Sequence, residues 1–113
     1  MSRILVIAAD SDLRRSLEFA VRADGHEVAC VTSIGAPVLP QAFDCTVADH
    51  HAMGKDLKQS SAFCRAFAPV ILLANCETHP LSPYVFRTLQ KPTLGPALSA
   101  AIHEAVAVRS TTK

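Results

Sequence analysis

Five short runs with the pattern of strands recur along the chain, and segments with helix or turn signals separate them. The runs cover residues 3–8, 26–31, 44–49, 70–74 and 85–90, and Pro69 opens the fourth. Short strands that alternate with helices are typical of a parallel sheet with helices on both faces. We therefore expect an α/β fold with a doubly wound, five-stranded parallel sheet and right-handed connections.

Three segments between or after these runs carry apolar residues at helical spacing. A first helix is expected over residues 11–23, with Ser11 as its N-cap and Gly25 as its stop. Another is expected over residues 56–68, and the last over residues 94–108. The side chains expected to face the core are Leu13, Leu17, Ala20 and Val21 in the first, and Leu57, Ala62 (or Ser61), Cys64 and Phe67 in the second.

Prolines interrupt the two remaining connections. Pro37 and Pro40 limit any helix between the second and third strands to a short or broken one. Pro80 and Pro83 make residues 77–84 a poor helix. We therefore expect the fourth helix of the alternating pattern to be shortened or missing.

The composition is that of one globular domain. Half of the 113 residues are hydrophobic, 19% are charged and the formal net charge is +1, which argues against disorder and against nucleic-acid binding through bulk charge. No apolar run is long enough to span a membrane, and no signal peptide is recognised. We expect one domain over residues 1–108 and a frayed tail over residues 109–113. The cysteines lack metal-ligand spacing and indicate a reducing, cytoplasmic setting without disulfides; they are Cys30, Cys45, Cys64 and Cys76.

The carboxyl ends of the expected strands meet at one edge of the sheet, where α/β proteins bind their ligands. Ala8 and Ala9 end the first strand, and Asp10 follows them. Asp49 ends the third strand, and Lys91 follows the fifth. The sequence therefore predicts an aspartate and a lysine close together at this edge, next to a strand tip made of two alanines.

The ordered set of these motifs resembles the receiver domain of bacterial two-component response regulators, over almost the whole chain. The matching stretches are RILVIAADSDLRRSL at the start, FDCTVAD at the third strand, PVILLAN at the fourth and QKP after the fifth. The resemblance implies the flavodoxin-like receiver topology and a role in phosphorelay signal transduction.

The resemblance also implies roles for individual residues. Asp49 matches the phosphoacceptor aspartate, Lys91 the lysine that pairs with the acyl phosphate, and Pro92 the adjoining proline, often in a cis peptide bond. Four other positions depart from the family pattern and imply a degenerate receiver, or pseudo-receiver. Ala8 and Ala9 stand where the family has the acidic pair that holds Mg²⁺, Ala74 where it has the switch Ser or Thr, and Thr88 where it has the switch aromatic.

Charge explains why these losses matter. Phosphoryl transfer to a carboxylate brings two anions together, and a metal ion and a cation normally neutralise them. Without the acidic pair we expect weak or absent Mg²⁺ binding, no other cofactor, and impaired phosphorylation of Asp49. Asp10 is a candidate acidic-pocket residue, but its position, like that of Asp12, also suits the first turn of a helix.

Some of these residues also have a purely structural interpretation. Asp49 and Lys91 can form a partly buried salt bridge without any chemistry. Arg14 and Arg15 suit the solvated face of the first helix.

A second class of function rests on the histidines after the third strand. His50, His51 and Cys76, with His79 near the same edge, are residue types that bind borderline metal ions, which suggests a small metal- or redox-responsive binding protein. The chain has no P-loop, GxGxxG or GxSxG motif, and none of its cysteines lies in a positively charged setting. We therefore do not expect an enzyme.

The first expectation for function remains an atypical single-domain receiver, a cytoplasmic phosphoprotein that acts mainly as a protein-interaction module. Its expected partners are a histidine kinase, a phosphotransferase or a downstream target, and a homodimer is a further option. Neither nucleic acid nor a membrane is expected. The family's usual dimerisation face, which includes the fourth helix, is expected to be reshaped here.

Overall fold

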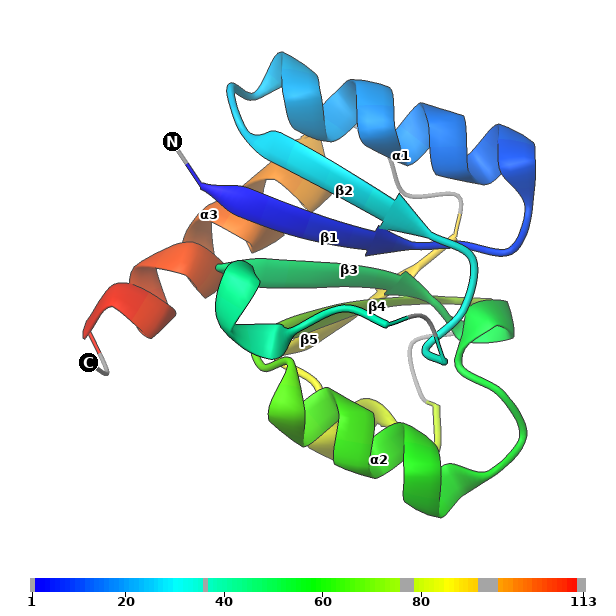
Figure 1. Cartoon of the computed structure of the whole chain (residues 1–113). Helices are drawn as coiled ribbons and strands as arrows, with labels where there is room; N and C mark the ends of the chain where they lie inside the picture. The colour runs from blue at the N-terminus through cyan, green and yellow to red at the C-terminus, as the bar shows by residue number, and fades with distance from the viewer. Residues whose placement is uncertain (1, 36, 76–78, 92–95, 112–113) are drawn as a thin grey trace.

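The structure, a computed structural model, describes residues 2–35, 37–75, 79–91 and 96–111 (Figure 1). The strands are β1 (Arg3–Ile7), β2 (Glu27–Val31), β3 (Cys45–Asp49), β4 (Val70–Ala74) and β5 (Arg87–Gln90). The helices are α1 (Ser11–Ala23), α2 (Leu57–Ala66) and α3 (Pro96–Thr111), and the 3₁₀ turns are η1 (Pro40–Ala42), η2 (His50–Ala52) and η3 (Ser82–Tyr84).

All five strands run parallel, in the spatial order β2-β1-β3-β4-β5. Helices α1 and α3 cover one face of the sheet, and α2 covers the other (Figure 1). This confirms the doubly wound sheet, in the flavodoxin-like strand order. Because the strands point the same way, their ends define two opposite edges, called here the carboxyl edge and the amino edge.

Two apolar layers, one on each face of the sheet, hold the helices in place. On one face, Leu17 of α1 and Ile102 of α3 pack against the central strands. On the other face, Phe63 and Cys64 of α2 do the same. The central strands β3 and β4 are buried along their whole length, whereas every residue of the outer strands β2 and β5 is half-buried or exposed.

Short turns stand in the two connections where prolines predicted a short, broken or missing helix. Between β2 and β3 the described residues contain only η1, and between β4 and β5 they contain only η3. Pro40 and Pro83 lie in the first two positions of these turns, where a missing backbone N–H is tolerated. The shortened fourth helix is thus confirmed, and the connection before β3 is reduced in the same way.

The predicted N-cap of the first helix is wrong. The cap of α1 is Asp10, whose carboxylate Oδ2 accepts a hydrogen bond from the backbone N–H of Leu13 at 3.2 Å. Ser11 is instead the first residue of the helix. Both residue types cap helices well, so the sequence pattern does not decide between neighbours.

The buried face of α2 also differs from the predicted one. Leu57 is exposed, so its placement on the buried side is wrong; of the two alternatives Ala62 and Ser61, Ala62 is exposed and Ser61 is buried. Two serines point inward in their place, because each hydroxyl has a partner: Ser60 Oγ donates to the Met53 carbonyl at 2.6 Å, and Ser61 Oγ donates to the Lys58 carbonyl at 3.0 Å. The buried residues of the helix are Ser60, Ser61, Phe63 and Cys64.

The ends of several elements shift relative to the prediction. β5 begins only at Arg87, because η3 and its cap occupy the residues before it. α3 continues past residue 108 to Thr111, so the expected boundary between domain and tail falls inside a helix. Its predicted start at residue 94 lies outside the described residues. Within the described part of the chain, no helix is long and apolar enough to cross a membrane.

Candidate functional site

An aspartate–lysine ion pair lies at the carboxyl edge of the sheet. Asp49 is the last residue of β3 and only 2% exposed, and Lys91 directly follows β5. The Lys91 Nζ atom lies 2.5 Å from Asp49 Oδ1. The backbone N–H of Lys91 also donates to the Ala74 carbonyl at 2.8 Å, which fixes the chain where it leaves β5. The two residues singled out from the sequence are thus in direct contact.

The tip of β1 offers no carboxylate to this edge. Ala8 is fully buried in the core on the α1–α3 side, and Ala9 is exposed. Asp10, the candidate acidic-pocket residue, is exposed and its carboxylate caps α1. This agrees with the structural interpretation of Asp10, whose position in the sequence suits the start of a helix.

Arg14 brings positive charge to the same strand tip. Its guanidinium Nη1 donates to the carbonyl oxygens of Ala8 at 3.0 Å and Ala9 at 3.4 Å. The prediction that Arg14 lies on the solvated face of the helix is therefore wrong, while Arg15 is exposed as expected. The sequence signal was present, because Arg14 lies one helical turn after the cap and can reach back over the strand end.

Ala74 and Thr88 are the two residues that the resemblance aligns with switch positions. Ala74 is buried at the end of β4 and has no hydroxyl. Thr88 Oγ1 forms a hydrogen bond of 3.0 Å with Ser82 Oγ. Ser82 Oγ also accepts a hydrogen bond from the backbone N–H of His79 at 3.0 Å. Thr88 is therefore bound to the turn that replaces the fourth helix. Sequence reasoning missed Ser82, because its partner lies on a different element.

Three histidines lie close together beside the ion pair, starting with His50, the residue that follows Asp49. The ring centroid of His50 lies 3.9 Å from that of His51 and 5.6 Å from that of His79. Burial lowers the pKa of His50, and the neighbouring His51 and Lys91 lower it further. The His50 Nε2 atom is buried and has no hydrogen-bond partner among the described residues. The neutral imidazole is therefore the favoured form beside the Asp49–Lys91 pair.

The donor set at the carboxyl edge does not suit Mg²⁺. This ion takes carboxylate and carbonyl oxygens and water. Here Asp49 is paired with the ammonium group of Lys91, and the carbonyls of Ala8 and Ala9 accept from the guanidinium of Arg14. A magnesium ion would meet two cationic groups and a single carboxylate at this edge.

Of the residues proposed for the alternative metal site, Cys76 lies outside the described residues. Pro92, the proline after Lys91, also lies outside them. Among the described residues, the group of potential metal ligands whose ligand atoms all lie within 4.8 Å of one another is Asp24, His26 and His103, at a different place in the fold.

Solved structures share this fold at low sequence identity. The chain is similar to a response regulator receiver domain protein from Clostridium thermocellum, with 22% identity, a TM-score of 0.79 and 100% coverage of both chains. It is also similar to a CheY-like receiver domain protein from Methanospirillum hungatei JF-1, with 15% identity and a TM-score of 0.81, covering 100% of this chain and 99% of the other.

A third similar structure has a metal ion in its cleft. It is the receiver domain of a sensor histidine kinase from Pseudomonas aeruginosa PAO1, with 16% identity, a TM-score of 0.73, and coverage of 94% of this chain and 98% of the other. That protein coordinates a magnesium ion in its active site cleft. By sequence, no protein-family model and no curated protein matches the chain.

Proposed function

Because the chain has the fold of response regulator receiver domains, we propose that it serves two-component phosphorelay signalling as an atypical receiver. In this proposal it acts mainly by binding another signalling protein, and its Mg²⁺-dependent phosphorylation is impaired or absent. The observation that carries the proposal is the Asp49–Lys91 ion pair beside a strand tip of two alanines.

The charges at the site support impaired phosphorylation. The Asp49 carboxylate is the candidate nucleophile, but it is almost fully buried and already neutralised by Lys91. A phosphodonor brings further negative charge, and preorganised cations have to stabilise that charge as the phosphoryl group transfers. With Ala8 and Ala9 at the tip of β1, Lys91 would have to do this without a carboxylate-held metal ion.

The switch positions support a single working conformation. A ligand shifts a conformational equilibrium only through contacts that differ between the two states. Ala74 has no hydroxyl with which to follow a phosphoryl group, and Thr88 is held by Ser82. A modified Asp49 therefore lacks the contacts that would drive a distant change.

The expected partner is a histidine kinase, a phosphotransferase or a downstream target. Because η3 stands in place of a full helix beside β5, the surface next to β5 differs from one built on a complete helix. Recognition in the proposed module then depends on a preformed surface rather than on phosphorylation. In this proposal the ion pair of Asp49 and Lys91 has a structural role.

Nuclear magnetic resonance tests this proposal without a known partner. Backbone amide spectra are recorded with Mg²⁺ and beryllium fluoride, a phosphoryl mimic, for the native chain and for Asp49→Asn. We expect any shifts that depend on Asp49 to stay at the end of β3 and at Lys91. Asp49-dependent shifts that spread through β4, η3 and β5 would overturn the proposal, because they would reveal an intact switch.

A further inference from the structure

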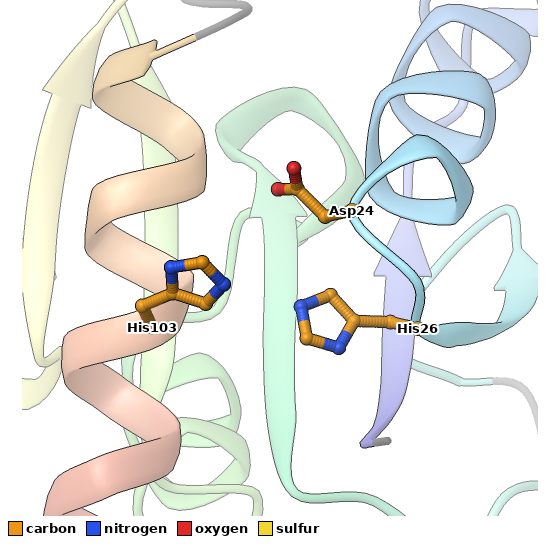
Figure 2. A group of neighbouring side chains, drawn as sticks. All are labelled: Asp24, His26 and His103. Carbon is orange, nitrogen blue, oxygen red and sulfur yellow. The ribbon is translucent and has the colours of Figure 1, made fainter.

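A cluster of potential metal-ligand side chains lies away from the carboxyl edge. Asp24 caps the end of α1, His26 directly precedes β2, and His103 lies on α3. Figure 2 shows the carboxylate and both imidazole rings turned toward one another across the space between α3 and the α1–β2 turn. Two elements far apart in the sequence therefore contribute to one group near the amino edge.

The geometry of this cluster is close to that of a metal site. One ligand atom from each residue lies within 4.8 Å of the other two. The imidazole rings are 5.8 Å apart between centroids and meet edge to face at 73°. Ligand atoms bound about 2.1 Å from one tetrahedral ion lie about 3.4 Å apart. Asp24 and His103 are exposed, so rotation of their side chains can close the remaining gap.

The polar atoms of His26 point independently to a ligand. Both of its ring nitrogens are buried, and neither has a hydrogen-bond partner among the described residues. Buried polar atoms are nearly always paired, because an unpaired one costs about 1–3 kcal/mol. An ion bound at one ring nitrogen would satisfy it.

The neighbouring acidic groups leave Asp24 as the carboxylate of the cluster. Asp44 accepts the backbone N–H of Arg3 at 2.9 Å, and Glu104 forms an ion pair with Arg87. For Asp24, by contrast, no salt bridge is found within the described part of the chain. Its carboxylate is therefore free to bind a cation.

We propose that Asp24, His26 and His103 bind a late first-row divalent metal ion of the Zn²⁺ type. Imidazole nitrogen and a single carboxylate suit Zn²⁺, whereas Mg²⁺ prefers oxygen ligands alone. Three protein ligands leave at least one position for water. The bound ion joins α3 to the start of β2 and lies apart from the Asp49–Lys91 pair, so this site is independent of the proposed signalling function.

Calorimetric titration of the metal-free chain with Zn²⁺ tests the proposal. We expect one ion per chain, an affinity at least tenfold weaker in His103→Ala, and a similar loss in Asp24→Asn. Both positions are exposed and alanine is a good helix former, so neither variant is expected to unfold. The matched control is His51→Ala, which removes an exposed histidine at the carboxyl edge and should leave the affinity within twofold.

Two outcomes would overturn the proposal. One is the absence of saturable Zn²⁺ binding to the native chain. The other is Zn²⁺ binding that His103→Ala leaves unweakened; if that binding is lost in His51→Ala, the ion lies at the carboxyl edge. A second readout distinguishes the same cases: paramagnetic Ni²⁺ should broaden the ring signals of His26 and His103 and leave those of His51 sharp.

Discussion

The two edges of the sheet differ in how their charged groups are paired. At the carboxyl edge, the buried carboxylate of Asp49 is paired with Lys91, and the carbonyls of Ala8 and Ala9 at the tip of β1 accept hydrogen bonds from Arg14, although His50 Nε2 is buried there without a partner among the described residues. Near the amino edge, the ring nitrogens of His26 are buried without a partner among the described residues, with His103 beside them. Satisfied polar groups hold a structure together, whereas unsatisfied ones indicate where a ligand is needed.

A buried charge at the tip of β1 should have the largest effect. Ala8 is 0% exposed and surrounded by apolar side chains. We predict that Ala8→Asp lowers the free energy of unfolding by about 3–4 kcal/mol, because a carboxylate is taken out of water there. Chemical denaturation measures this change.

The neighbouring alanine provides the control for that substitution. Ala9 is exposed, so Ala9→Asp should cost about 1 kcal/mol at most. Equal losses at the two positions would mean that the tip of β1 is not embedded in the core as described.

Breaking the ion pair at the carboxyl edge should have the next largest effect. We predict that Lys91→Met destabilises the fold by about 3 kcal/mol, because it leaves the buried Asp49 charge without its partner. The double variant Asp49→Asn/Lys91→Met should recover part of this loss in the same denaturation experiment. Additive losses in the double variant would show that the two residues are not coupled.

The corresponding change near the amino edge should have the smallest effect. Without metal, His103→Ala removes an exposed side chain that makes only a ring contact with His26. We predict a change within about 0.5 kcal/mol, typical of surface substitutions. Adding Zn²⁺ should raise the melting temperature of the native chain more than that of His103→Ala at the same Zn²⁺ concentration. A large loss without metal would instead make His103 a structural residue.

The fold and the closeness of Asp49 and Lys91 could both be predicted from where the strands begin and end in the sequence. The carboxyl ends of parallel strands share one edge of the sheet. Because Asp49 ends β3 and Lys91 follows β5, both residues lie at that edge. No comparable rule places His26 beside His103, because the position of a helix across a sheet depends on packing along its whole length. The Ser82–Thr88 hydrogen bond likewise depends on side-chain conformations, which residue spacing does not encode.

The most direct test of the account is the reaction of the chain with a small phosphodonor. The native protein and Asp49→Asn are incubated with acetyl phosphate, with and without Mg²⁺, and their intact masses are compared over time. We predict little or no gain of a phosphoryl group by the native chain, and no acceleration by Mg²⁺, because Lys91 already neutralises Asp49 and β1 ends in alanines. Rapid, stoichiometric and Mg²⁺-dependent phosphorylation that disappears in Asp49→Asn would contradict the account.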